Sequence, residues 1–328
     1  MLPNKLNLVV DMYGCPNRCK HCWLGHMPNI KMEDDLKIVE YFKNHFEKIA
    51  YYSWVREPDY CDDYKKRWVR DCEISIHTKP ERFELASFYR IVRDEYYIPF
   101  LKSVNVKTIQ LTIFGLEENT DFYVGRKGAF KEILEAARRL LKNDIAVRFQ
   151  AFINEQNKYD LVKFVQYLKN SELKKCELFI HAGSCDGENQ KLYSQRICEV
   201  PKELEMYCLN LNTWRTEKEW RKELQECQEN VHLDFDDELT LNISNQLDIY
   251  FNFTHMSKEW KIGNIKKTDI NELMKKIETR SIDVLKIADS TPISTLVELY
   301  GNKDSLRLFE KEDYLQYLIN CHMKKERL

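Results

Sequence analysis

The sequence predicts an α/β protein in which a partial (βα)6 barrel is followed by a smaller α+β C-terminal extension. Up to about residue 200, apolar strand-like runs alternate with amphipathic helix-like runs across short connections, a rhythm typical of parallel strands. Beyond Val200 this rhythm stops, which divides the chain into residues 1–200 and 201–328. A chain of 328 residues is long enough for one large core with a smaller unit appended.

Six strand–helix units account for the first part of the chain. The predicted strands are Leu6–Met12, Ile49–Val55, Cys72–His77, Lys107–Phe114, Ile145–Ile153 and Cys176–His181. Apolar residues spaced three and four apart predict helices over Met32–Lys48, Glu84–Val104, Phe130–Lys142 and Tyr159–Lys169. In the extension, Leu239–Phe253 is typical of paired strands and Ile270–Thr279 of a helix. In barrels of this kind the chemistry lies at the carboxyl ends of the strands, so the strand-to-helix turns are the places to examine.

Charge and hydropathy exclude some classes of function. The formal net charge is −2, which gives no argument for nucleic acid or an anionic membrane as a partner. No apolar run approaches the length that crosses a bilayer, so we expect a soluble, cytoplasmic protein. The chain holds eleven cysteines, and most of those beyond the first three are expected to be buried free thiols.

The most informative motif follows the first predicted strand. Cys15, Cys19 and Cys22 occupy one short loop with the spacing Cys-x3-Cys-x2-Cys. Three thiolates can hold a cubane [4Fe-4S] cluster by three of its irons and leave the fourth iron without a protein ligand. An iron that is open to another molecule distinguishes a catalytic cluster from one that only transfers electrons.

These cysteines have two other interpretations, a structural zinc site and a disulfide framework. A structural zinc site needs four ligands, and His21 or His26 can supply the fourth, but no second Cys-x2-Cys-like pair accompanies the loop. A disulfide framework is disfavoured because three cysteines on one short loop cannot all pair locally, and no signal peptide indicates an oxidising compartment. The spacing therefore favours the cluster.

The loop resembles the signature of the radical S-adenosylmethionine (radical SAM) enzymes. This resemblance implies a [4Fe-4S] cluster on Cys15, Cys19 and Cys22, with S-adenosylmethionine as the second cofactor. It further implies reductive cleavage to a 5′-deoxyadenosyl radical that removes hydrogen from a substrate. An electron donor such as flavodoxin or ferredoxin is the implied partner.

The same resemblance assigns residues to the cofactor. The family's Gly-Gly-Glu-Pro motif matches the turn after the second strand, where Glu57 keeps the carboxylate while Val55 and Arg56 replace the glycines. By resemblance, Gln110 or Thr112 faces the ribose or carboxylate of S-adenosylmethionine. The remaining cofactor-binding candidates are Arg126, which can pair with the methionine carboxylate, and His21 and Trp23 in the cysteine loop.

Alternation along the fifth predicted strand indicates cavity-lining residues. Polar residues alternate with apolar ones, which is unusual for a strand buried on both faces, so Arg148, Gln150 and Asn154 are candidates for lining a cavity that holds adenosine or substrate. Of these, Gln150 and Asn154 are counted among the cofactor-binding candidates. His181 ends the sixth strand, and Cys185 lies in the polar loop that follows. These two are the candidate catalytic residues.

The extension resembles a SPASM or twitch module that lacks its cysteines, because Asn252 stands near the place of the first cluster ligand. We therefore expect one cluster in the chain, which is similar overall to radical SAM proteins of anaerobic Firmicutes. A small-molecule substrate is favoured, because few residues precede Cys15 and peptide maturases often carry a leader-binding module there. The alternatives are a peptide maturase and a non-catalytic, zinc-binding barrel protein.

Overall fold

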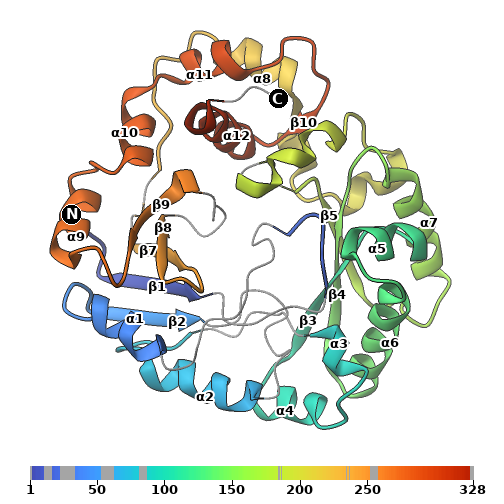
Figure 1. Cartoon of the computed structure of the whole chain (residues 1–328). Coiled ribbons are helices and arrows are strands. Elements are labelled where there is room, and N and C mark those ends of the chain that lie inside the picture. The colour runs from blue at the N-terminus through green and yellow to red at the C-terminus, as the bar shows by residue number, and fades with distance from the viewer. Residues whose placement is uncertain are drawn as a thin grey trace.

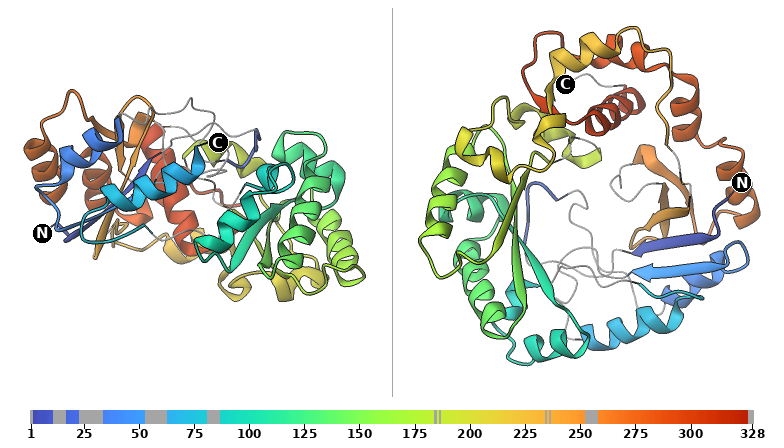
Figure 2. Two further views of the ribbon diagram at one scale, coloured as in Figure 1. Left: turned by 90° about the horizontal axis from the view of Figure 1, so that it is seen from below. Right: turned by 180° about the vertical axis from the view of Figure 1, so that it is seen from behind.

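The computed structural model describes residues 2–10, 17–22, 34–52, 63–80, 87–183, 185, 187–233, 235, 237–251 and 258–325. In these residues the strands lie on the inside of a broken ring and most helices lie outside it (Figure 1). Figure 2 shows the same two layers from below and from behind. No helix within these ranges is long and apolar enough to cross a membrane.

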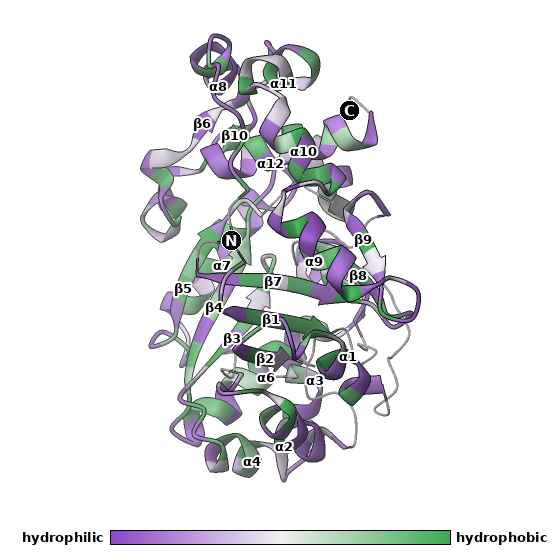
Figure 3. Cartoon of the chain, turned by 90° about the vertical axis from the view of Figure 1, so that its left-hand side faces the viewer, coloured by the Kyte–Doolittle hydropathy of each residue, from purple (hydrophilic) through white to green (hydrophobic). Residues whose placement is uncertain are grey.

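The first sheet joins the start of the chain to its C-terminal part. Its strand order is β2-β1-β7-β8-β9. Its strands are β1 (Lys5–Val10), β2 (Lys48–Tyr52), β7 (Glu238–Ile243), β8 (Asp248–Phe251) and β9 (Lys261–Asn264). β1 pairs in parallel with both β2 and β7, whereas β7, β8 and β9 form an antiparallel meander. Figure 3 shows β1 as a hydrophobic strand between these two parallel neighbours.

The second sheet is parallel throughout, with β3 (Thr108–Ile113), β4 (Ala146–Phe152) and β5 (Glu177–His181) in this order. Along β3 and β4 the residues alternate between buried and half-buried, so one face packs against helices and the other faces the inside of the ring. The pairing places Thr112 beside Gln150 and Phe152 beside His181. The inner face is therefore lined by polar and aromatic side chains.

The helices connect and cover these sheets. They are α1 (Asp35–Phe42), α2 (Tyr64–Ile74), α3 (Phe88–Ile91), α4 (Tyr97–Ser103), α5 (Glu117–Val124), α6 (Ala129–Lys142), α7 (Lys158–Lys169), α8 (Glu217–Leu224), α9 (Ile270–Glu278), α10 (Asp283–Ser290), α11 (Ile293–Tyr300) and α12 (Lys311–Lys324). Short 3-10 helices span Gly187–Gln195, Lys202–Tyr207, Leu211–Thr213 and Lys258–Trp260. The two-residue strands β6 (Arg215–Thr216) and β10 (Leu308–Phe309) pair antiparallel.

Two large hydrophobic cores stabilise the ring. One joins β1, β2 and β7 to α1 and to the C-terminal helices, with fully buried Leu6, Phe42 and Leu318 among its members. The other packs β3–β5 against α3–α7, around residues such as Phe149 and Phe164. Burial of this extent is the main favourable contribution to folding. The tail therefore shares a core with the start of the chain.

The described residues confirm the predicted α/β class and partial barrel, but two predicted elements were wrong. Cys72–His77 is not a strand, because α2 continues to Ile74 and only Ile76 forms a single antiparallel bridge with Ile49. The buried face of α2 includes the charged side chains Arg67 and Asp71, so its helical period carries little hydrophobic signal.

The helix predicted over Glu84–Val104 is also wrong as a single element, because it consists of α3 and α4. Ser87 caps α3, and Asp94 lies in the connection, where its carboxylate accepts a hydrogen bond from the Tyr96 amide. A side chain that bonds its own backbone in this way favours a turn over a continuous helix. The paired strands near Leu239 and the helix beginning at Ile270 are confirmed. The domain boundary near residue 200 stays a prediction.

Candidate functional site

The cysteine loop is fixed by backbone contacts to the end of α5. The Arg18 amide donates to the Val124 carbonyl at 2.9 Å, and the Lys20 amide donates to the Tyr123 carbonyl at 2.8 Å. Gly125 ends α5 with a φ of 70°, and a Cβ there would lie 2.5 Å from the Arg18 carbonyl oxygen. Glycine is therefore required both for the left-handed turn and for this close approach.

The described cysteines of the loop lie one turn apart. The Cys22 amide donates to the Cys19 carbonyl at 3.1 Å, and both side chains are partly exposed and outside any disulfide. Cys15, Trp23 and Glu57 lie outside the described residues. Within the described ranges no three His, Cys, Asp or Glu side chains gather as a metal site. The predicted ligand set thus depends on Cys15 joining the two thiols that are described.

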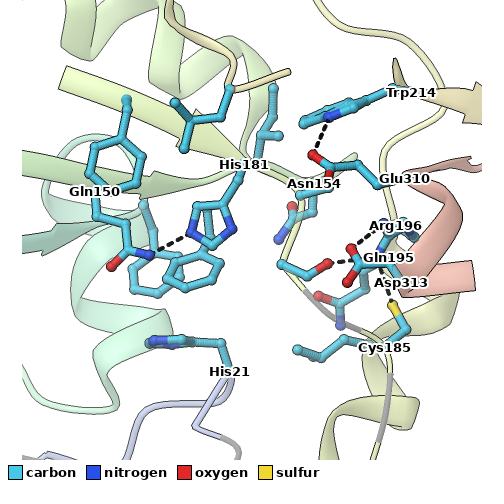
Figure 4. Close-up of a pocket in the computed structure, with 18 of the residues that line it drawn as sticks. His21, Gln150, Asn154, His181, Cys185, Gln195, Arg196, Trp214, Glu310 and Asp313 are labelled. Atoms are coloured by element: carbon cyan, nitrogen blue, oxygen red, sulfur yellow. Dashed lines mark hydrogen bonds and ion pairs between the residues drawn. The ribbon is translucent and has the colours of Figure 1, made fainter. Parts of the chain in front are cut away.

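A cavity of about 540 Å³ lies between the cysteine loop, the carboxyl ends of β4 and β5, and the tail (Figure 4). His21 lines it from the cysteine loop, and Gln150 and His181 line it from β4 and β5. Glu310 and Asp313 line it from the start of α12. Segments distant in sequence therefore form one site at the carboxyl ends of the parallel strands, where barrel chemistry is expected.

A row of hydrogen bonds crosses the inner face of the second sheet. Arg148 Nη2 donates to Gln110 Oε1 at 2.9 Å, and Gln110 Nε2 donates to Gln150 Oε1 at 2.5 Å. Gln150 Nε2 lies 2.6 Å from His181 Nε2. The row brings one guanidinium, two amides and one imidazole into a single connected line that ends at the cavity.

Aromatic rings enclose the two imidazoles. The His21 ring lies 4.7 Å from the Phe114 ring and 4.6 Å from the Phe152 ring, and His181 lies 4.3 Å from Phe152. Burial, followed by the nearby His181, lowers the pKa of His21 to about 3. Burial, followed by the charge of Arg196, lowers the pKa of His181 to about 4. Both rings are therefore neutral near pH 7.

The opposite wall is built around the buried side chain of Arg196. Its guanidinium donates to the carbonyl oxygens of Gly183 at 2.6 Å and Leu308 at 2.5 Å, and stacks on Phe309 at 3.8 Å. It also lies 3.2 Å from Asp313 Oδ2 and 3.4 Å from Cys185 Sγ. One cation thus joins the loop after β5, the strand β10 and the helix α12.

Further polar contacts complete the lining. Trp214 Nε1 donates to Glu310 Oε1 at 3.0 Å, which joins two tail residues at the cavity edge. Asn154 Nδ2 donates to the Tyr123 hydroxyl at 2.9 Å, and this hydroxyl also lies 2.9 Å from Gln195 Oε1. The hydroxyl ties α5, the residues after β4 and the segment before Arg196 into one hydrogen-bonded group.

The structure brings together only part of the predicted site. His21, Gln150, Asn154, His181 and Cys185 all line the cavity. Arg148, which the strand pattern also predicts to line the cavity, does not line it, and neither do three of the candidate cofactor residues. Gln110 lies behind Gln150, Thr112 is on the same strand face as Gln110, and Arg126 instead donates to the Asn17 side chain at 3.0 Å and pairs with Glu132. The cofactor roles of these three residues stay predictions.

Sequence reasoning missed most of the opposite wall, namely Tyr123, Gln195, Arg196, Trp214, Glu310 and Asp313. None of these residues lies in a motif, and they come from both sides of the predicted domain boundary: Tyr123, Gln195 and Arg196 precede it, and Trp214, Glu310 and Asp313 follow it. Nothing in the residues that flank Arg196 indicates that it is buried and bonded. Two of its partners, Leu308 and Asp313, lie more than 100 positions away in the sequence.

Acid should destabilise the protein through His181. Its pKa is about 4 in the folded state and about 6.5 when exposed, so between these values the unfolded chain binds a proton that the folded chain does not. Stability from this residue is complete above pH 6.5 and is lost as the pH falls to about 4, by roughly 3 kcal/mol. Denaturant unfolding measured from pH 7 to pH 4 checks this.

The matched variants for this experiment are His181→Gln and His232→Gln. His181→Gln should reduce the loss of stability between pH 6.5 and pH 4 to the part that the buried His21 contributes, whereas replacement of the exposed His232 should leave the wild-type slope. Equal slopes in the wild type and in His181→Gln would contradict the assignment of this acid sensitivity to His181.

Comparison with known proteins agrees with this geometry. The fold is a partial barrel with a cavity at its strand ends, and residues 9–168 match the model of the Radical SAM superfamily. The chain therefore carries a radical SAM domain and is a radical SAM enzyme, with a [4Fe-4S] cluster and S-adenosylmethionine as its cofactors. No curated protein matches the chain significantly.

Solved structures with a similar fold include native anSMEcpe with bound AdoMet and the Cp18Cys peptide. That structure is 13% identical, with a TM-score of 0.55, and the match covers 98% of this chain and 97% of the other. Native anSMEcpe with bound AdoMet alone is similar at 13% identity and a TM-score of 0.55, over 97% and 98% of the two chains. At this identity the likeness shows a shared fold, here over nearly the whole chain.

The residues present fit these cofactors. Cys19 and Cys22 supply the soft thiolate ligands that iron–sulfur clusters require, on a loop held in place by α5. Between them, His21 Nδ1 is buried and has no hydrogen-bond partner among the described residues. A buried polar atom without a partner is costly, so this atom indicates a polar group that arrives with a bound molecule. The cofactor site and the cavity thus meet at His21.

Proposed function

We propose that the enzyme cleaves S-adenosylmethionine reductively at a cluster held by Cys15, Cys19 and Cys22, and acts on a small molecule bound in the cavity. One observation carries this proposal, namely that His21, between two of the cluster cysteines, lines the same cavity as Gln150 and His181. When bound, the cofactors supply a 5′-deoxyadenosyl radical that abstracts hydrogen. A substrate in the cavity would lie directly beside the place where that radical forms.

The size and lining of the cavity favour a small substrate. About 540 Å³ is within the range of sites for drug-sized molecules, roughly 300–1,000 Å³. Phe114, Phe152 and Phe179 give it apolar walls that exclude water, while Gln150 and Asn154 offer amide groups that can fix an orientation. Excluding water protects a radical from side reactions.

His181 and Cys185 are proposed to contact the substrate at its reacting end. Cys185 Sγ accepts a hydrogen bond from Arg196 at 3.4 Å and lines the cavity, and we propose that it acts as a thiol. Such a thiol can return a hydrogen atom to a substrate radical. The resulting thiyl radical would then take one electron and one proton, the electron coming from a donor such as flavodoxin or ferredoxin.

A peptide is the second candidate substrate, because a similar fold binds the Cp18Cys peptide and AdoMet together. The extension, which resembles a cysteine-poor SPASM or twitch module, contributes Trp214, Glu310 and Asp313 to the cavity. We propose that it closes the open side of the barrel and shapes the substrate pocket. Substrate-stimulated 5′-deoxyadenosine formation, tested with the small-molecule and peptide fractions of a cytoplasmic extract, separates the two candidates.

The cofactor prediction is tested by reconstitution. Anaerobically reconstituted protein should bind about four irons and four sulfides, because three thiolates and one open iron make a cubane. After reduction it should show a paramagnetic signal that changes on adding S-adenosylmethionine, and it should form 5′-deoxyadenosine. Iron and sulfide analysis, electron paramagnetic resonance and chromatography measure these three outcomes.

The opposite result would favour the non-catalytic, zinc-binding alternative. Tightly bound zinc, no cluster signal after reconstitution and no cleavage of S-adenosylmethionine would together contradict the proposed function. Zinc has no redox chemistry and prefers four closed ligands in structural sites, so these outcomes are mutually exclusive with a cluster that has an open iron.

A further inference from the structure

Arg148, Gln110, Gln150 and His181 form a row of hydrogen bonds in which the donor and the acceptor of each bond can be assigned from the chemistry of the side chains. Arg148 carries only donors, so the atom of Gln110 that faces it must be the oxygen. The amide nitrogen of Gln110 then faces Gln150 and must meet the Gln150 oxygen. This leaves the Gln150 nitrogen as a donor toward His181 Nε2, at 2.6 Å. Each orientation follows from the one before it, starting from a group that cannot reverse.

This direction settles the tautomer of His181. A nitrogen that accepts a hydrogen bond carries no proton, so Nε2 is unprotonated and the single proton of the neutral ring is on Nδ1. The ring lies beside the Gln150 amide, and both side chains line the cavity (Figure 4). Among the described residues, no side chain is found to accept a hydrogen bond from His181 Nδ1.

The geometry points to Arg148, Gln110 and Gln150 as positioning residues that hold His181 as the Nδ1–H tautomer, a neutral donor to an acceptor oxygen of the substrate. This inference rests on the proposed function, because it assumes that the substrate occupies the cavity. It narrows the substrate to molecules with a carbonyl, carboxylate or hydroxyl oxygen close to the reacting position. Arg148 and Gln110 act through His181 and need no contact with the substrate, whereas Gln150 both donates to His181 and lines the cavity.

The tautomer is directly measurable in the full-length, anaerobically reconstituted protein. Nitrogen-15 NMR of histidine-labelled protein distinguishes protonated from unprotonated ring nitrogens, and the His181→Gln variant assigns the signal. We expect Nδ1 to be protonated and Nε2 to be unprotonated in the wild type. Protonation at Nε2 in the wild type would overturn the inference without any variant.

Gln110→Glu is the sharpest variant because residue 110 does not contact His181. A carboxylate at position 110 has no hydrogen to donate, so the Gln150 amide should turn to give its nitrogen to Glu and its oxygen to His181. That oxygen can accept only if Nε2 of His181 carries the proton. The ratio of the Nε2–H to the Nδ1–H tautomer should therefore rise by about tenfold or more, which corresponds to the free energy of about one hydrogen bond. An unchanged tautomer in folded Gln110→Glu would overturn the inference.

Two further variants keep the test decisive. Gln150→Glu places an acceptor next to Nε2 directly and should also protonate it, so it replaces Gln110→Glu if that variant does not fold. Gln166→Glu makes the same chemical change on the exposed face of α7 and should leave the His181 spectrum unchanged. If the His181 spectrum changed in Gln166→Glu, or did not change in Gln150→Glu, the claim that the hydrogen-bonded row sets the His181 tautomer would be contradicted.

The donor's exposure to the cavity is tested with dimethyl sulfoxide, a small probe that only accepts hydrogen bonds. It should shift the Nδ1–H resonance of the wild type and have no such effect in Gln110→Glu. Absence of a shift in the wild type would show that this donor is closed to ligands. The tautomer can be measured without turnover, so the two claims fail separately. Cleavage of S-adenosylmethionine by a protein whose His181 is protonated on Nε2 would refute this inference alone. Protonation of His181 on Nδ1 in a protein that does not cleave S-adenosylmethionine would refute the proposed function alone.

Discussion

Replacing Cys15, Cys19 and Cys22 together with alanine is expected to remove all cluster iron and to abolish cleavage of S-adenosylmethionine. Of these three, Cys19 and Cys22 lie one turn apart on the loop that α5 holds in place. The loss should be complete, because the later cysteines are too far apart in the sequence to predict an auxiliary cluster. Iron analysis after anaerobic reconstitution measures it.

The control replaces three other partly exposed cysteines, Cys72, Cys198 and Cys227, with alanine. This variant should retain about four irons and the paramagnetic signal, since none of these thiols is predicted to be a ligand. If the first triple variant still held about four irons, later cysteines would have to be ligands, and the prediction of a single cluster would be wrong.

Arg196→Met is expected to lower the free energy of unfolding by about 3–5 kcal/mol, because two carbonyl oxygens lose a charged donor at about 1–3 kcal/mol each and the ion pair with the partly exposed Asp313 is lost as well. The guanidinium is 1% exposed, and its loss leaves two carbonyl oxygens and the Asp313 carboxylate without their donor. Methionine retains much of the side-chain length, so the effect measures the polar contacts more than the loss of volume. Chemical denaturation of the variant beside the wild type gives the value.

Two companion variants define what this result means. Arg138→Met removes a cation that pairs with Glu172 on the surface, where the arginine is 40% exposed, and should cost at most about 1 kcal/mol. Arg196→Lys keeps the charge but loses the planar fork, so it should recover only part of the loss. A change below about 1 kcal/mol in Arg196→Met would show that this network does not stabilise the fold.

Much of the barrel could be predicted from the sequence because its strands carry strong periodic signals. β4 alternates polar and apolar residues, and this pattern on a barrel strand predicted that Arg148, Gln150 and Asn154 line a cavity, which is confirmed for Gln150 and Asn154. β1, β2, β3 and β5 were found close to their predicted positions, since buried parallel strands are short runs of apolar residues. The helices α6 and α7 agree to within one residue at their starts.

The predictions that failed concern a helix and a cavity wall whose side chains give no periodic hydrophobic signal. Arg67 lies on the buried face of α2 and pairs with Asp35 at 2.6 Å, so the helix lacked the apolar stripe that would have identified it. The cavity wall around Arg196 was not predicted for another reason. The hydrogen-bond partners of Arg196 in β10 and α12 are brought to it only by the tertiary fold. Local pattern cannot report a contact between residues more than 100 positions apart.

The position of β1 has a consequence for the order of folding. β1 leads toward the cysteine loop, yet it pairs with β7 through contacts such as Lys5 with Glu238, which are 233 residues apart. Contacts of such high sequence separation form slowly, and at about 5–20 residues per second the ribosome needs tens of seconds to complete this partner. The cysteine loop therefore leaves the ribosome early, but β1, which leads to it, can pair with β7 only much later. We expect the cluster to be inserted after synthesis has finished.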